Sequence, residues 1–278
     1  MKNFNLCAFA DEADGTLSGQ IAALKDNKIG LLEIRGVDGK NISEITLPEA
    51  KEIKKRLDDG GIKVWSLGSP LGKVDIKDPF DSQLELCAHL VELAQVLDAP
   101  NIRMFSFYGT NGEPSFESAV LENLNKFVQK AKNSGVTLCH ENEKGIYGDT
   151  PGRCAAIHKN LPDIKSVFDP ANFIQCGVDV VSAWDKLASY VKYVHIKDAL
   201  ADGIVVPAGH GAGNIPYILK EFAVGGGTLT IEPHLHVFDG FSKLEEDNKE
   251  IKGKYIYPTS RAAFDAAVQA LIDCIKAV

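Results

Sequence analysis

The feature that most constrains the fold of this chain is a regular alternation of short β-rich runs with longer segments of helical period. The alternation continues from one end of the 278-residue sequence to the other. Several of the short runs are almost continuously apolar, as is typical of parallel strands covered on both faces. Eight runs are predicted as strands: Leu6–Ala10, Leu31–Arg35, Ile62–Leu67, Asn101–Phe107, Val136–Glu141, Ser166–Asp169, Tyr193–Lys197 and Thr228–Glu232.

The segments between these runs carry the signals of helices. Apolar residues recur at helical spacing over 84–97 and 120–131, which gives each segment one buried stripe. Thr46 is followed three residues later by Glu49, which is the spacing of a capping box. Thr150-Pro151 and Thr259-Ser260 are typical of further helix starts.

Eight such units favour a single α/β domain over residues 1–278, a closed (β/α)8 TIM barrel. The alternative is a doubly wound open sheet, which more often has fewer strands and a glycine-rich phosphate loop. Two long loops are expected after the seventh and eighth strands, Ala199–Gly213 and His236–Tyr257. Both follow strand carboxyl ends, where barrels build their active sites.

Composition excludes several classes of function. The formal charge of -8 disfavours a nucleic-acid partner, which usually needs a basic surface. No apolar run is long enough to span a bilayer and the amino terminus lacks the core of a signal peptide, so a cytoplasmic protein is expected. The six cysteines form no CxxC pair, which indicates reduced, structural thiols. No GxxxxGK[ST], GxSxG or HExxH motif is present.

Polar residues end four consecutive predicted strands, and they are Glu141, Asp169, His195 and Glu232. Parallel strands of a closed barrel aim such residues at one mouth, where three carboxylates without a cation would repel one another. A divalent ion removes that conflict, and this oxygen and nitrogen donor set suits Mn²⁺, Mg²⁺, Co²⁺ or Zn²⁺ without selecting among them. The alternative is that the four are unrelated polar residues at loop starts.

The four motifs are His-Glu-Asn at 140–142, Asp-x-x-Asn at 169–172, His-x-Lys-Asp at 195–198 and Ile-Glu-Pro at 231–233. Their order resembles the xylose isomerase-like TIM-barrel superfamily, and more closely its sugar phosphate isomerase/epimerase branch, which includes D-tagatose 3-epimerase and the inosose isomerases and dehydratases. The resemblance covers nearly the whole chain. It implies that the four positions bind one divalent metal, that Glu141 and Glu232 also transfer protons, and that the protein is a homo-oligomer.

Two positions depart from the family pattern. Tagatose-type epimerases carry His where this chain has Asn172, and an amide cannot titrate. The glycine-rich loop usually has an acidic residue where this chain has His210. The same epimerase chemistry is therefore in question.

The arrangement suits proton transfer at a carbon next to a carbonyl, because a metal stabilises the enediolate and carboxylates move the proton. The leading hypothesis is a metal-dependent isomerase or epimerase of carbohydrate metabolism, acting on a sugar, a sugar phosphate or a keto-inositol. A lyase that dehydrates a keto-sugar or inosose, or cleaves a 3-keto-glycoside, is the alternative. An endonuclease IV-like enzyme of DNA repair and a non-catalytic sugar binder are further alternatives.

A second group of polar residues is predicted at the same mouth as possible substrate contacts. Glu33 and Arg35 share one face of the second strand, where a buried ion pair is the favoured interpretation for them. Lys197 shares the face of His195, so its ammonium group is expected to hold a substrate oxygen or a phosphate. The predicted substrate-contact set is Asn172, Lys197, His210, Glu33 and His234, each with an ordinary structural alternative.

Overall fold

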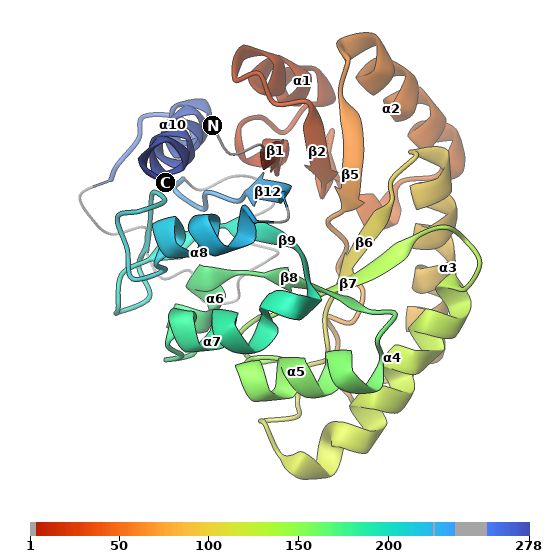
Figure 1. The fold of residues 1–278 in the computed structure, drawn as a ribbon. Coiled ribbons are helices and arrows are strands. Elements are labelled where there is room, and N and C mark those ends of the chain that lie inside the picture. Colours follow the sequence, from red (N-terminus) through yellow and green to blue (C-terminus); the bar gives the residue numbers. More distant parts are fainter. Residues whose placement is uncertain (1–3, 225, 237–254) are drawn as a thin grey trace.

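The computed structural model describes residues 4–224, 226–236 and 255–278. Eight parallel strands form a closed barrel in the order β1-β12-β9-β8-β7-β6-β5-β2 (Figure 1). The strands are β1 (Phe4–Ala8), β2 (Leu31–Ile34), β5 (Lys63–Leu67), β6 (Asn101–Met104), β7 (Thr137–Glu141), β8 (Lys165–Phe168), β9 (Val191–Ile196) and β12 (Gly227–Ile231). The predicted (β/α)8 barrel is thus confirmed, and the open-sheet alternative is wrong because β1 pairs with β12 and closes the cylinder.

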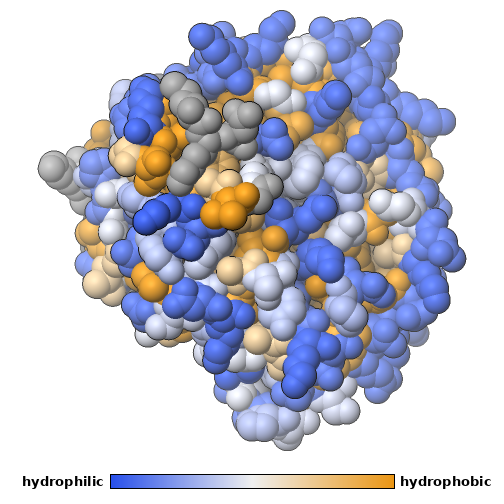
Figure 2. Space-filling model, viewed as in Figure 1, coloured by the Kyte–Doolittle hydropathy of each residue, from blue (hydrophilic) through white to orange (hydrophobic). Residues whose placement is uncertain are grey.

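Helices surround the barrel on its outside, as Figure 1 shows. They are α1 (Leu17–Asp26), α2 (Leu47–Gly60), α3 (Asp81–Val96), α4 (Glu117–Ala131), α5 (Pro151–Asn160), α6 (Pro170–Gln175), α7 (Val180–Leu187), α8 (Ile215–Phe222) and α10 (Ser260–Ala277). Short 3-10 turns occur at η1 (Ala10–Glu12), η2 (Ile42–Glu44), η3 (Pro114–Phe116) and η4 (Ala188–Tyr190). Apolar side chains from strands and helices form one large core, while polar residues cover much of the face seen in Figure 2.

The helix signals are confirmed at the capping residues. The Thr46 side chain accepts a hydrogen bond from the Glu49 backbone N–H, and the Glu49 side chain accepts one from the Thr46 backbone N–H. These two bonds complete the capping box at the start of α2. Gly61 ends that helix in the left-handed conformation with φ 74°. Thr259 caps α10 through a bond from the Ala262 N–H, whereas the Thr150 side chain makes no capping bond to α5.

Two predicted strands are too long by more than one residue at their carboxyl ends. The first ends at Ala8 because Ala10 begins η1. The fourth ends at Met104 because the next residues turn to the loop after β5, with the N–H of Phe105 bonded to the Leu71 carbonyl and that of Phe107 to the Gly72 carbonyl. Both differences lie at the mouth of the barrel, where backbone groups leave the ladder to build loops.

The loop after β9 contains a short antiparallel pair, β10 (Asp198–Ala199) with β11 (Val205–Val206). A similar pair, β3 (Gly36–Val37) with β4 (Lys40–Asn41), follows β2, and the sequence patterns predicted neither. Most of the other predicted loop, His236–Tyr257, lies outside the described residues. Among the helices that are described, none combines the length and apolar character needed to cross a membrane.

Candidate metal centre

The four side chains predicted as metal ligands meet at the carboxyl-terminal mouth of the barrel. They come from β7, β8, β9 and β12 or from the residue that follows the strand, and these strands are neighbours in the barrel. One ligand atom from each of Glu141, Asp169, His195 and Glu232 lies within 4.8 Å of every other. All four residues are at most 3% exposed, so they form one buried cluster.

Two asparagine side chains tie together the ends of β7 and β8, next to Glu141 and Asp169. The side chain of Asn142 donates to the Asp169 carbonyl at 2.9 Å and accepts from the Asp169 N–H at 2.9 Å, which ties the two strand ends together. Asp169 caps α6, because its Oδ1 accepts the Asn172 N–H at 2.9 Å. The Asn172 amide donates to the Asn142 carbonyl at 2.9 Å and lies 3.4 Å from Glu141 Oε1. Asn172 therefore orients the cluster from one side.

The imidazole of His195 lies between carboxylates on both of its edges. Its Nδ1 is 3.0 Å from Glu141 Oε1 and 3.2 Å from Glu232 Oε2. Its Nε2 is 3.2 Å from Oε2 of Glu33, whose other oxygen accepts the Tyr193 hydroxyl at 2.8 Å. A carboxylate behind a histidine is the usual device that orients a metal-binding imidazole. The structure thus places Glu33 beneath His195, where it is fully buried.

Three buried cations neutralise the carboxylates. Lys197 Nζ is 2.8 Å from Asp169 Oδ2 and 3.3 Å from Glu232 Oε2. Arg103 Nη1 is 3.1 Å from Glu141 Oε2, and Arg35 Nη1 is 3.1 Å from Glu232 Oε1. The pairing of Arg35 agrees with the favoured interpretation that it is a buried structural cation, although its partners are Asp11, Glu12 and Glu232 rather than Glu33.

This crowding shifts the pKa values of the cluster in opposite directions. Burial alone disfavours a charged imidazole, but the carboxylates of Glu141, Glu33 and Glu232 together raise the pKa of His195 well above its ordinary value. Burial raises the pKa of Asp169 to about 7 against the opposing charge of Lys197. Burial also opposes ionisation of Glu141, yet His195 and Arg103 lower the pKa of that carboxyl to about 2. Without a metal, the site therefore holds protons on His195 and partly on Asp169.

The donor set fits a divalent cation. Oε2 of Glu141 and Oδ2 of Asp169 are buried and accept no well-formed hydrogen bond from the described residues, apart from their ion-pair contacts with Arg103 and Lys197. Each residue of the cluster offers one ligand atom, and these four atoms lie within 4.8 Å of one another. Three carboxylate oxygens and one imidazole nitrogen make a donor set that Mn²⁺, Mg²⁺, Co²⁺ and Zn²⁺ accept.

A second group, Glu12, Glu232 and His234, also has ligand atoms within 4.8 Å of one another. Its two carboxylates already bond the guanidinium of Arg35, at 3.1 Å each. This group offers three ligand residues against four and shares Glu232 with the first group, so the first group is the better candidate for a cation.

A small cavity opens onto the cluster, and its walls are all polar. The structure brings Lys197 and His234 to this cavity, as predicted for the mouth, and places Asn172 and Glu33 against the cluster itself. It does not bring His210 there: that residue is exposed on the glycine-rich loop, with its ring 5.4 Å from that of Tyr255. The residues that line the cavity are Arg35, Lys73, Arg103, Glu141, Glu143, Lys197, Glu232 and His234.

The loop that carries His210 is organised by a different residue, Asp198. Its buried carboxylate accepts the N–H groups of Gly209, Gly211 and Gly213 at 2.8–3.0 Å, so the glycine-rich segment wraps around one side chain. This explains why the loop is rich in glycine: a Cβ on Gly211 would lie 2.3 Å from the Ala199 carbonyl oxygen.

Arg103 and Asn142 also belong to the site, although neither is among the residues predicted for it. Arg103 stands in the predicted strand 101–107, and a lone arginine in a run of otherwise mostly apolar residues is a signal that could have been used. Asn142 belongs to the motif that was noticed, but nothing in the sequence shows that its amide bridges two strands.

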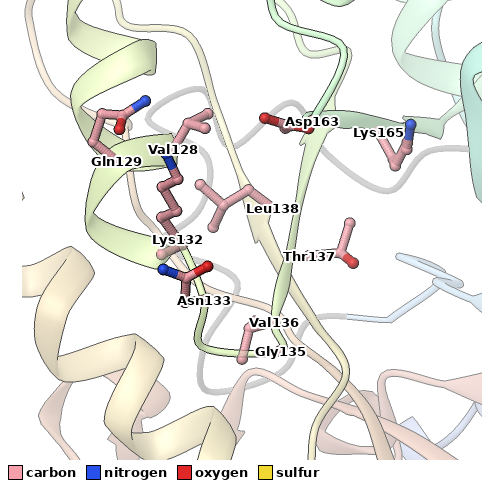
Figure 3. Close-up of a pocket in the computed structure, with 11 residues that line it drawn as sticks. Val128, Gln129, Lys132, Asn133, Gly135, Val136, Thr137, Leu138, Asp163 and Lys165 are labelled. Atoms are coloured by element: carbon pink, nitrogen blue, oxygen red, sulfur yellow. The ribbon is translucent and has the colours of Figure 1, made fainter.

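A larger cavity of about 430 Å³ lies at the opposite, amino-terminal end of β7. Figure 3 shows its walls, with Gln129 on α4 and Lys132 just after that helix lying beside Leu138 on β7. Both groups of potential metal ligands found among the described residues lie at the other end of the barrel. The chemistry-bearing side chains therefore point to the carboxyl-terminal mouth as the functional site.

Comparison with known proteins agrees with this geometry. Residues 21–251 match the family described as xylose isomerase-like TIM barrel, and the chain belongs to that family. An inosose dehydratase of Mesomycoplasma hyopneumoniae (strain 7448) is 23% identical over 188 residues, and the match covers 62% of this chain and 62% of that protein. The chain thus matches less than two thirds of the length of this curated relative.

Solved structures share the fold at low identity. A D-psicose 3-epimerase from Clostridium cellulolyticum H10, solved with D-tagatose, superposes with a TM-score of 0.75 at 15% identity and covers 99% of both chains. The IOLI protein with a bound zinc atom superposes with a TM-score of 0.76 at 14% identity, also over 99% of both chains. At these identities the likeness shows the fold alone.

Proposed function

We propose that this protein is a divalent-metal-dependent enzyme that moves a proton at a carbon next to a carbonyl, as a sugar isomerase or epimerase does. The observation that carries the proposal is the buried cluster of Glu141, Asp169, His195 and Glu232, whose ligand atoms converge within 4.8 Å at the mouth of the barrel. These four residues would hold the metal. When bound, the metal would supply a Lewis acid for the negative charge that develops on the substrate oxygens.

Glu141 and Glu232 are proposed as the groups that take up and return the proton. Both line the cavity, and Glu141 Oε1 and Glu232 Oε2 lie on the same imidazole nitrogen of His195 at 3.0 and 3.2 Å. Burial opposes their ionisation, but neighbouring cations lower the pKa of both, so each carboxyl is ionised at neutral pH and able to accept a proton. Lys197, between Asp169 and Glu232, is placed to donate to a substrate oxygen next to the reacting carbon.

Dehydration of a keto-sugar or inosose is the second candidate. The curated relative named inosose dehydratase supports it, because its sequence match is better than chance would give over 188 residues. Asn172 supports it too, because its amide contacts Glu141 Oε1 at 3.4 Å and cannot titrate at the position where tagatose-type epimerases carry histidine. Elimination needs a base on one carbon and an acid for the leaving hydroxyl, and the same two carboxylates can serve.

The test is exchange of a substrate proton with solvent. The Mn²⁺-loaded protein is incubated in D2O with D-tagatose, D-fructose or scyllo-inosose, and the products are followed by NMR. Isomerase or epimerase activity incorporates deuterium next to the carbonyl, whereas a dehydratase produces an enone that absorbs in the ultraviolet.

On the substrate that reacts, Glu141→Gln and Glu232→Gln are each expected to lower kcat by about 100-fold or more at saturating Mn²⁺. The surface change Lys126→Met, on α4 and 43% exposed, is the matched control and keeps full activity. Full turnover by both glutamine variants would remove the proton-transfer assignment.

A further inference from the structure

The cavity above the cluster is lined by four cations, Arg35, Lys73, Arg103 and Lys197. A neutral sugar presents hydroxyl groups, which carboxylates, amides and backbone groups can bind as well as cations do. Four positive side chains around one small cavity therefore need a separate explanation. Some of them balance the buried carboxylates, and the question is whether all of them do.

Two of the four already pair with two or more carboxylates each. Arg35 bonds Asp11 through two nitrogens, at 2.8 and 3.1 Å, and also reaches Glu12 and Glu232 at 3.1 Å each. Lys197 lies between Asp169 and Glu232. These two side chains balance charge within the site.

The other two cations have donors to spare. Arg103 is 4% exposed, and its polar contacts among the described residues are with Glu141 Oε2 at 3.1 Å and the Ser69 carbonyl at 3.3 Å, while its Nε has no hydrogen-bond partner there. Lys73 has one carboxylate partner, Glu143 at 3.3 Å, for its three N–H donors. A buried guanidinium nitrogen without an acceptor is costly, and Arg103 lines the cavity, so its unused donors point to an acceptor that arrives with the ligand.

Arg103 and Lys73 belong to one wall of the cavity. Both lie over the ring of Phe105, at 4.8 and 4.3 Å from its centroid. The loop that carries Lys73 is held against the chain after β6: Gly72 has φ 82°, and a Cβ there would lie 2.2 Å from the Phe105 carbonyl oxygen. The two cations are therefore positioned by the backbone before any ligand binds, which reduces the entropy lost on binding.

We propose that Arg103 and Lys73 form an oxyanion subsite, so that the substrate carries a carboxylate or phosphate group besides the carbons that react at the metal. The proposal rests on the proposed function, because Arg103 also contacts Glu141 and the anionic group would therefore lie next to the metal ligands. A planar guanidinium with a free Nε matches the two oxygens of a carboxylate, and a neighbouring ammonium adds a second charge-assisted bond.

The test compares matched neutral and anionic ligands. Calorimetric titration of the Mn²⁺-loaded protein measures the affinity of D-galactose against D-galacturonate, and of D-fructose against D-fructose 6-phosphate. At least one anionic member is expected to bind about tenfold more tightly than its neutral partner, which is the size of one charge-assisted hydrogen bond. The first pair reports a carboxylate and the second a phosphate, so the pair that shows the preference identifies the group.

Variants tie the preference to the subsite. Lys73→Met and Arg103→Met are each expected to reduce the anionic advantage to less than about threefold. Lys73→Met is also expected to keep the affinity for the neutral partner, since the neutral ligand makes no bond that needs the Lys73 ammonium group. Lys73 is 15% exposed at the rim, so its variant serves even if Arg103→Met does not fold. Lys126→Met is the charge-matched control and keeps the full preference.

The outcome separates this proposal from the proposed function. Equal affinities in both pairs, a preference that survives Lys73→Met, or no binding of any of the four ligands overturns the oxyanion subsite, while Mn²⁺ binding and proton exchange stay intact. If the wild-type protein fails to bind Mn²⁺, the metal-dependent function is lost, and the same four titrations without metal still decide whether the anion is preferred.

Discussion

Binding of Mn²⁺ to this protein is expected to release about 1.5 protons at pH 7. In the metal-free site His195 carries a proton, because the surrounding carboxylates raise its pKa well above the ordinary value even though burial opposes this. Asp169, with a pKa raised by burial to about 7, is half protonated. A metal ligand must be neutral imidazole or ionised carboxylate, so occupation of the site expels about one proton from His195 and about half a proton from Asp169.

The pH dependence of the affinity follows from this number. Each proton released makes the affinity rise tenfold per pH unit. Between pH 6 and pH 8, His195 contributes about 100-fold and Asp169 about tenfold, so the dissociation constant for Mn²⁺ is expected to fall by about 1000-fold, or about 4 kcal/mol. The sign is fixed by the raised pKa values: affinity is low where the groups are protonated and rises as pH rises through each pKa.

Calorimetry in buffers of different ionisation enthalpy measures the proton count directly. Glu33→Gln is the informative variant, because it removes one carboxylate that raises the pKa of His195 but leaves all four proposed ligands in place. It is expected to weaken the pH dependence, while Lys126→Met leaves it unchanged. A pH-independent affinity with no proton release would refute the assignment of His195 and Asp169 as ligands.

Three further predictions concern the frame around the site. Lowering the pH from 7 to 5 is expected to cost about 2 kcal/mol of stability through His140 alone. Burial lowers the pKa of His140 to about 3, so below about pH 6.5 the unfolded chain binds a proton on this residue that the folded chain does not bind. The variant His140→Asn should show a smaller loss of stability in urea titrations at the two pH values. Asp198→Ala leaves the loop N–H groups without their acceptor and is expected to lose about 3 kcal/mol in the same assay, whereas Asp198→Asn keeps one acceptor oxygen and loses less. Gly72→Ala places a Cβ against the Phe105 carbonyl and is expected to cost about 2 kcal/mol or more, while Gly30→Ala, which meets nothing within 4 Å, should cost under about 1 kcal/mol; equal stability of the two would contradict the packing argument.

The barrel and the four candidate ligands could be predicted because one simple rule places both. Parallel strands buried on two faces have almost continuously apolar sequences, and a polar residue at the carboxyl end of such a run lies at the carboxyl-terminal mouth of the barrel. Since β12, β9, β8 and β7 are neighbours, residues at equivalent depth on them must come together. Strand order and depth alone therefore determine that Glu141, Asp169, His195 and Glu232 are close, although they do not determine what the cluster binds.

The rest depends on side-chain directions and backbone departures that no spacing encodes. Arg103 reaches Glu141 because β6 and β7 are adjacent and both side chains turn into the barrel. From the sequence alone, an arginine inside an apolar run is equally consistent with a position at the edge of a sheet. His210 lies between two glycines in a loop, and only the N–H bonds to Asp198 show that the loop wraps the aspartate and leaves the histidine exposed. The sequence pattern predicts where the backbone of a residue lies, whereas the hydrogen-bond network of the folded chain determines which groups its side chain contacts.

The cations inside the cluster indicate how such a concentration of carboxylates can fold without metal. Removing the charge partners of buried carboxylates is strongly destabilising, and here Lys197, Arg103 and the proton on His195 supply those partners from the chain itself. A metal that occupies the proposed site must compete with Lys197 for Asp169 and with a proton for His195, so part of its intrinsic affinity is spent on breaking these contacts. The barrel is accordingly expected to stay folded when the metal is removed by a chelator, with the far-ultraviolet circular dichroism unchanged and the melting temperature lowered only by the linkage of binding to folding. Global unfolding by chelator would show instead that the internal ion pairs do not balance the site, and the cations at the mouth would then need another role.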